Sequence, residues 1–110
     1  MIKKFNKIVN NLIQDLKSSV DRGEYSLASC YATQLYKLLD LISKIGEEIF
    51  IYDPINENIK RVIFLGLRKR SRCLLVTKED DLSITDYHID YYLPEWYIER
   101  LYRKLEGKRK

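Results

Sequence analysis

Residues 59–77 read IKRVIFLGLRKRSRCLLVT, two short apolar runs joined by a segment in which four of five residues are basic. The runs 62–67 and 73–76 are rich in residues that favour strands buried on both faces. With Arg68–Arg72 as the connecting loop, the stretch predicts a β-hairpin. A single helix over residues 56–78 is the competing interpretation, because periodicity alone does not distinguish a short buried strand from a buried helix.

The basic segment also lies where the net charge of the protein is concentrated. The chain of 110 residues has a net charge of +4, yet residues 1–54 contain seven basic and seven acidic groups. Between Asn58 and Lys78 there is no acidic residue, whereas basic residues stand at positions 60, 61, 68, 69, 70, 72 and 78. Such segregation creates a local positive potential that the total charge understates.

The N-terminal half is predicted to be a helical hairpin. From Ile2 to Val20, and again from about Glu24 or Ser26 to Ile45 or beyond, apolar residues follow the i, i+3, i+4, i+7 pattern of amphipathic helices. Gly23 suits the end of the first helix, because glycine accepts a left-handed conformation at little steric cost. So short a link forces the helices to lie antiparallel. The expected inner positions of the second helix are Ala28, Tyr31, Leu35, Leu38, Leu39, Ile42, Ile45 and Ile49.

The last third predicts a strand followed by a helix. Apolar and polar residues alternate from Thr85 to Leu93, a period of two that is typical of a strand with one solvated face. Pro94 suits the first position of a helix, and Glu95 is favourable near its positive end. We expect this helix to reach about Leu105.

These elements predict an α+β fold, with an N-terminal antiparallel helical hairpin packed on a small antiparallel sheet of about three strands and a C-terminal helix. An all-α bundle is the alternative. The length is that of a single domain, residues 1–110. Within it we expect the hairpin over 1–50, the sheet over 59–93, the C-terminal helix over 94–106 and a frayed basic tail over 107–110.

No catalytic or cofactor motif is present in the sequence. His88, the one histidine, stands between Asp86 and Asp90 on the predicted solvated face, and the glycines at 23, 46, 66 and 107 form no phosphate-binding loop. A small metal site at Asp86, His88 and Asp90 is a minor alternative to an exposed imidazole. Cys30 and Cys73 lack a CxxC spacing and are expected to be buried reduced thiols. We therefore expect no cofactor, no metal and no enzymatic activity.

Two groups of residues are candidates for contact with nucleic acid or a partner protein. Arginine side chains in the basic loop are suited to bind phosphates by bidentate hydrogen bonds. In the C-terminal helix, a projection of 100° per residue places a tryptophan with basic residues on the face opposite the apolar one, an arrangement suited to base stacking. The alternative for the loop is a charged tip that keeps a hairpin soluble, and the alternative for the tryptophan is packing on the preceding strand. The candidate residues are Arg68, Lys69, Arg70, Arg72, Trp96, Arg100, Arg103 and Lys104.

The segment YYLPEWYIERLYRKLEGK, with Leu93, Pro94, Glu95 and Leu101, resembles the strand-then-LPE-helix ending of the small domain in GINS replication-complex subunits. The chain is too short for a complete two-domain subunit, and no site residue is transferred. The stretch SLASCYATQLYKLLDLI resembles HEPN-type helical domains, but no arginine precedes His88 at the spacing of their ribonuclease motif.

The leading functional hypothesis is a small non-enzymatic accessory protein that contacts DNA or RNA through the basic loop and the basic, Trp-bearing C-terminal helix. The alternative is a protein–protein interaction subunit, or homodimer, that uses the helical hairpin and does not contact nucleic acid. No apolar run approaches the roughly twenty residues of a membrane span, and no secretory signal is present. A cytoplasmic protein without a membrane partner is therefore expected.

Overall fold

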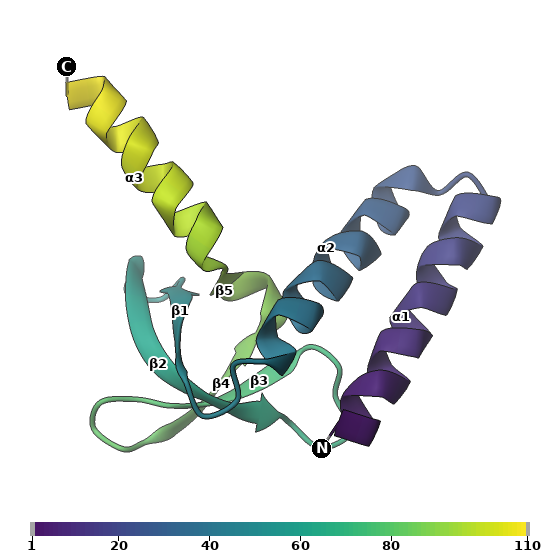
Figure 1. The fold of residues 1–110 in the computed structure, drawn as a ribbon, viewed down its shortest axis with the longest axis horizontal. Coiled ribbons are helices and arrows are strands. Elements are labelled where there is room, and N and C mark those ends of the chain that lie inside the picture. The colour runs from purple at the N-terminus through teal and green to yellow at the C-terminus, as the bar shows by residue number, and fades with distance from the viewer. Residues whose placement is uncertain (1, 110) are drawn as a thin grey trace.

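The computed structural model describes residues 2–109 as a helix pair, a five-stranded antiparallel sheet and a C-terminal helix (Figure 1). The predicted α+β class is confirmed, and the all-α alternative is wrong. The sheet is larger than the predicted one, with five strands rather than about three. The sequence patterns missed strand β1 (Glu48–Asp53), and they did not separate the two-residue strand β5 (Tyr92–Leu93) from the strand predicted up to Leu93. These two strands pair with each other.

The helix pair consists of α1 (Ile2–Asp21) and α2 (Tyr25–Ile42), which lie antiparallel and pack along their length (Figure 1). Gly23 has a φ of 73°, the left-handed conformation expected at this turn. Its amide donates a 3.0 Å hydrogen bond to the carbonyl oxygen of Val20, and Glu24 donates one of 2.9 Å to Ser19. The helical hairpin predicted from periodicity is thus present.

The second helix ends earlier than predicted, at Ile42 rather than at Ile45 or beyond. Residues 43–46 form turns, and Gly46 adopts a φ of +85°, a conformation that suits glycine. Its amide donates a 2.7 Å hydrogen bond to the carbonyl oxygen of Phe64 in the sheet. The chain therefore turns at Gly46 and continues as strand β1 (Glu48–Asp53). Ile49 is buried, as predicted, but it lies on a strand and not on a helix.

The sheet has the strand order β4-β3-β2-β1-β5. After β1 come β2 (Asn58–Leu67), β3 (Leu74–Lys78), β4 (Ile84–His88) and the two-residue β5 (Tyr92–Leu93). The hairpin predicted for 59–77 is confirmed as β2 and β3, and the helical alternative for this stretch is wrong. A bulge between Phe64 and Gly66, where Gly66 has a φ of +140°, adds to the curvature of β2 that Figure 1 shows.

The predicted continuous strand up to Leu93 is interrupted by a single turn of 3₁₀-helix, η1 (Ile89–Tyr91). The side chain of His88 accepts a 3.1 Å hydrogen bond from the amide of Asp90 and so caps this turn. Because the turn shifts the alternation of side chains, Tyr92 is buried with 1% of its surface exposed, whereas Tyr91 is exposed. The predicted alternation, in which Tyr91 shares a face with Tyr87 and Leu93, would have turned Tyr91 inward and is wrong at this position.

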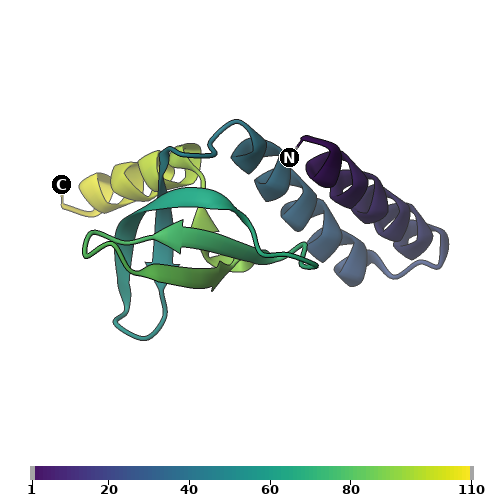
Figure 2. The same ribbon diagram turned by 90° about the horizontal axis from the view of Figure 1, so that it is seen from below.

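One hydrophobic core joins the helix pair to the inner face of the sheet (Figure 2). Both helices and every strand from β1 to β3 contribute fully buried side chains, and η1 and β5 add one each. The core consists of Phe5, Leu12, Leu38, Leu41, Ile49, Ile51, Val62, Phe64, Leu75, Ile89 and Tyr92.

The C-terminal helix α3 (Glu95–Arg109) begins beside α2, where Trp96 contacts Tyr36, and then diverges from the helix pair (Figures 1 and 2). Ile98 is buried, but Tyr97 and Tyr102 are 40% and 63% exposed. The helix continues to Arg109 rather than ending near Leu105, so the predicted basic tail is helical up to Arg109; Lys110 lies outside the described residues. Within residues 2–109, no helix combines the length and apolarity required to cross a bilayer.

Candidate nucleic-acid interface

The basic loop between β2 and β3 is held in one conformation by its own backbone and by Ser71. The amide of Arg68 donates a 2.9 Å hydrogen bond to the carbonyl oxygen of Leu74 across the loop. The hydroxyl of Ser71 accepts hydrogen bonds from the amides of Cys73 and Leu74, at 3.2 and 3.0 Å. Arg70 has a φ of 64°, so the tip is a tight left-handed turn. Ser71, the one uncharged residue of the segment, thus has a structural role.

Two of the four basic side chains in this loop are occupied by ion pairs. Nε of Arg68 lies 2.9 Å from a carboxylate oxygen of Asp86 on β4, and this contact lowers the pKa of Asp86. Nη1 of Arg72 lies 2.6 Å from a carboxylate oxygen of Asp15 on α1, with its guanidinium 5.6 Å from the ring centre of Tyr31. Both acidic partners come from distant parts of the sequence, so the sequence pattern did not reveal them.

The other two basic side chains, Lys69 and Arg70, are exposed at the tip of the loop. Within residues 2–109, neither side chain takes part in a hydrogen bond or an ion pair. They are therefore the charges of the segment that remain available to a ligand.

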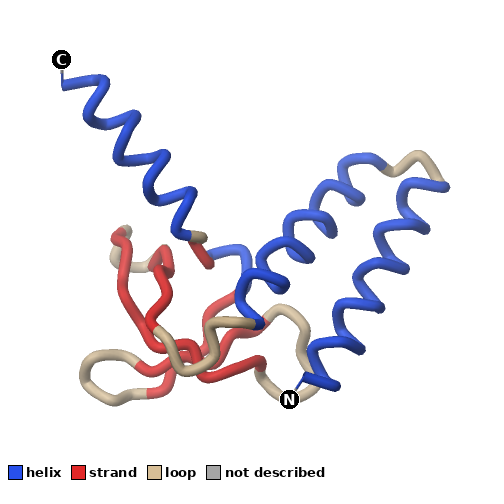
Figure 3. Tube along the Cα trace, viewed as in Figure 1, coloured by secondary structure: helices blue, strands red, loops and turns tan. Residues whose placement is uncertain are grey.

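The loop lies against the N-terminal part of α1, which carries further positive charge. Nζ of Lys4 donates hydrogen bonds to the carbonyl oxygens of Leu67 and Arg68, at 3.1 and 3.3 Å. Figure 3 shows the loop in tan beside the start of α1. Two residues of α1, Lys4 and Asp15, contact the loop, and Lys7 lies between them in the sequence. Lys3 lies next to Lys4 on an adjoining face of the helix. We call Lys3, Lys4, Lys7, Lys69 and Arg70 the basic end.

The lysines of α1 did not stand out in the sequence, because residues 1–54 are neutral as a whole. A finer count would have found them, since the first acidic residue of the chain is Asp15. The first turn of α1 contains no acidic residue that would offset its positive helix end.

The candidate residues of α3 lie on the other side of the sheet from the loop (Figures 1 and 2). The indole ring of Trp96 is packed edge-on against Tyr36 of α2, with 6.0 Å between ring centres, and is 48% exposed. It contacts Tyr97 in the same geometry and at the same distance. Arg100, Arg103 and Lys104 are exposed. The structure therefore does not unite the two candidate groups in one surface.

A hollow of about 670 Å³ separates α3 from the β1–β2 end of the sheet. Its walls include Tyr52, Tyr91 and Tyr97, which add apolar surface beside α3. Glu57 and Asp90 also line it, and their negative charge is unfavourable for a polyanion.

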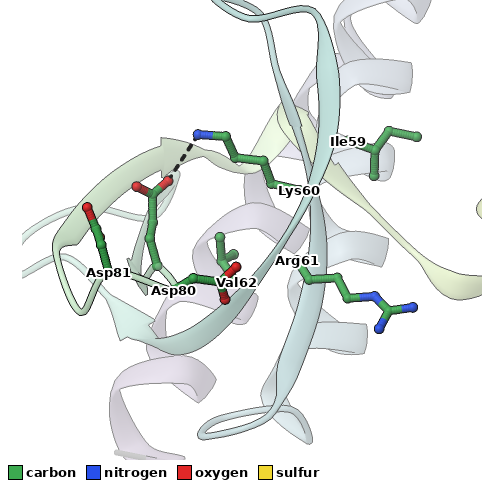
Figure 4. Close-up of a pocket in the computed structure, with 7 residues that line it drawn as sticks. Ile59, Lys60, Arg61, Val62, Asp80 and Asp81 are labelled. Atoms are coloured by element: carbon green, nitrogen blue, oxygen red, sulfur yellow. Dashed lines mark hydrogen bonds and ion pairs between the residues drawn. The ribbon is translucent and has the colours of Figure 1, made fainter.

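Acidic residues gather around Lys60, beside a hollow of about 420 Å³ at the β3–β4 turn. Figure 4 shows Lys60 and Arg61 leaving opposite faces of β2. Nζ of Lys60 lies 3.0 Å from Asp53 and 3.4 Å from Glu79, while the guanidinium of Arg61 lies 5.5 Å from the ring centre of Phe50. Hydrogen bonds from Lys60 and then Asn56 lower the pKa of Asp53 to about 2. Lys60 and its two acidic partners therefore offset one another's charge.

His88 borders a hollow of about 370 Å³ that Glu79, Lys60 and Tyr87 also line. The lining contains no serine or cysteine for His88 to activate, and Nδ1 of His88 already accepts a hydrogen bond from the amide of Asp90. Asp86 is turned to Arg68, and within residues 2–109 no three His, Cys, Asp or Glu side chains are grouped as metal ligands. Both cysteines are free; Cys73 is partly buried, but Cys30 is exposed, contrary to expectation.

No known protein-family model, curated protein sequence or solved structure matches this chain.

Proposed function

We propose that this protein is a small non-enzymatic accessory protein that contacts nucleic acid through its basic end. The contact between Lys4 and the carbonyl oxygens of Leu67 and Arg68 supports this most strongly. It joins the start of the loop to the lysine-bearing start of α1, so positive charge from two distant segments acts at one end of the molecule.

The charge balance at the basic end favours a polyanion. The neighbouring acids Asp15 and Asp86 are already paired with Arg72 and Arg68. The exposed ammonium and guanidinium groups that remain are suited to phosphate oxygens, and their binding releases counterions from the nucleic acid. Such contacts are independent of sequence, because phosphates carry no base information.

The test is a titration of the protein against a nonspecific DNA duplex over a range of salt concentrations. If most residues of the basic end contact phosphates in wild type, the logarithm of the binding constant should fall with the logarithm of the salt concentration with a slope of about −3 to −4. The quadruple variant K3A/K7A/K69A/R70A should lose most of this slope and at least tenfold in affinity at low salt. Lys4 is retained because it holds the loop.

Two matched variants complete this experiment. Lys17→Ala removes an exposed lysine of α1 that lies beyond Asp15, and it should change the slope by less than the error. The variant R100A/R103A/K104A tests whether α3 makes a second, separate contact with the DNA duplex. Unchanged affinity and slope in a folded quadruple variant would exclude the basic end as the binding surface. A loss of affinity confined to the α3 variant would mean that α3 is the binding surface instead.

The second candidate function is that of a protein–protein interaction subunit, and exposed apolar side chains on the helical hairpin support it. Five large apolar side chains there are at least 38% exposed: Val20, Tyr25, Leu27, Tyr36 and Leu39. Apolar contacts are screened little by salt, so a complex formed through this surface should persist at high ionic strength, unlike binding at the basic end.

A further inference from the structure

The outward side of α2 carries a regular stripe of exposed residues, one of which, Tyr36, also packs edge-on against Trp96 of α3. Three large side chains, Tyr25, Tyr36 and Leu39, are 71%, 47% and 52% exposed. Between and beyond them stand the exposed small residues Ser29, Ala32 and Ser43. The six positions follow one another at alternating spacings of four and three residues, the spacing of a coiled-coil seam.

The stripe carries no charge. The two ionised residues of α2, Lys37 and Asp40, are both engaged with other parts of the protein. Nζ of Lys37 lies 2.8 Å from the carbonyl oxygen of Asp90, and Asp40 accepts a hydrogen bond from the hydroxyl of Tyr92 and lies 3.5 Å from Nζ of Lys44. Two copies of this positively charged protein can therefore meet along the stripe without like-charge repulsion at the contact.

Large and small residues are placed symmetrically along the stripe. If a second α2 runs antiparallel, with the two-fold axis passing at the level of position 34, Tyr36 faces Ala32 of the second copy. In the same register Leu39 faces Ser29, and Tyr25 faces Ser43. Every large side chain thus meets a small one, which is the packing that interdigitating helices require. Opposed helix dipoles also favour this direction.

We propose that the protein forms a homodimer through an antiparallel α2–α2 contact in this register. This proposal does not depend on nucleic-acid binding. The seam is only as long as α2, about 27 Å at 1.5 Å per residue, so the buried area falls at the low end for stable interfaces. We accordingly expect a dissociation constant in the micromolar range, on the order of 10 μM.

The experiment is sedimentation of the full chain from about 1 to 300 μM, in about 0.1 M and 1 M salt. Wild type should pass from monomer to dimer over this range at both salt concentrations. Ala32→Arg places a charge at the centre of the seam and should raise the dissociation constant at least tenfold. The matched control Asn10→Arg adds the same charge to an exposed position of α1 and should leave dimerisation unchanged.

Exchanging the large and small side chains at positions 32 and 36 tests the proposed register of the two α2 helices. Ala32→Tyr alone sets two tyrosines opposite each other and should weaken the dimer about tenfold, whereas the double variant A32Y/Y36A again pairs each large residue with a small one. The double variant should return to within about threefold of wild type. Each variant must keep the helical circular dichroism of wild type.

Three results would overturn the proposal. A wild type that stays monomeric up to the highest concentration would leave the stripe to a different partner. A dimer unaffected by Ala32→Arg would locate the contact elsewhere on the molecule. A folded double variant that is no better than Ala32→Tyr would exclude this register.

Discussion

Arg72 donates a 2.6 Å hydrogen bond from Nη1 to a carboxylate oxygen of Asp15, and this contact attaches the β2–β3 loop to α1 across 57 positions of sequence. The same arginine lies over the ring of Tyr31 on α2. The pair therefore connects the sheet to both helices at the point where the loop carries its charge.

We predict that the Arg72–Asp15 pair contributes little to global stability. Both side chains are more than a third exposed, and exposed pairs typically couple by about 0.2–1 kcal/mol. A double-mutant cycle with Arg72→Ala and Asp15→Ala, measured by urea unfolding, should return a coupling free energy in this range. A value above about 2 kcal/mol would mean that the pair is shielded from water in solution.

The Arg68–Asp86 pair leads to a prediction about binding, in which loss of the acidic partner strengthens the affinity for a duplex. Asp86→Asn removes the negative charge that neutralises Arg68. If the basic end binds phosphates, duplex affinity should rise severalfold, and the magnitude of the salt slope should increase by up to about 1. Salt-dependent duplex binding measures both quantities.

Asp81→Asn is the matched control for this prediction. Asp81 is also exposed and has a lowered pKa, but its partner is Ser83 at the β3–β4 turn and not an arginine. Equal effects of the two substitutions would show that only the net charge of the protein matters, and not the freeing of Arg68.

Two leucines of the helix pair should differ sharply in their contribution to folding. Leu12 of α1 is 0% exposed within the shared core, whereas Leu39 of α2 is 52% exposed. Leu12→Ala should lower the free energy of unfolding by about 2–5 kcal/mol, since it leaves a cavity. Leu39→Ala should change it by no more than about 0.5 kcal/mol at concentrations where the protein is monomeric. Similar losses in urea unfolding would contradict the arrangement of the helix pair.

Asp53 should make stability depend on pH under acidic conditions. Its pKa is lowered to about 2 in the folded protein, against an ordinary value of 3.8, by Lys60 and Asn56. The folded state therefore gains stability above the unfolded pKa and loses it as the pH falls from about 4 towards 2. Urea unfolding of wild type and Asp53→Asn at several pH values should show a difference that is largest near neutral pH.

That difference should shrink steadily below pH 4, because protonated aspartate resembles asparagine in charge. Asp80→Asn, at an exposed position nearby, serves as the control and should follow wild type throughout. A difference between wild type and Asp53→Asn that does not vary with pH would mean that hydrogen-bond geometry, and not the charge of Asp53, is what matters.

The helix pair and the β2–β3 hairpin were predictable because each has a clear local signature. Apolar residues repeat with the period of a helix up to Ile42, and the apolar runs beside the basic segment suit buried strands. β1 was missed because Ile45 and Ile49 continued the helical apolar spacing of α2, although the helix ends at Ile42 and the chain turns at Gly46. The two-residue β5 is below the length that any sequence period can indicate.

The candidate site was predictable only in part. The sequence located the basic segment, but Arg68 and Arg72 are neutralised by acids 18 and 57 positions away. The lysines of α1 joined the loop through a contact over 63 positions. Trp96 was expected either on the free polar face of α3 or over the preceding strand, whereas it packs edge-on against Tyr36 of α2.

By itself, the sequence determined the N-terminal helix pair, favoured the β2–β3 hairpin, and showed where positive charge is concentrated along the chain. Periodicity and local composition are short-range properties, and a single stretch of residues is enough to express them. Only the tertiary structure decided which of those charges remain free, because ion pairs form between side chains that folding brings together. Lys69 and Arg70 remain available to a ligand because Asp15 and Asp86 pair with the arginines on either side of them.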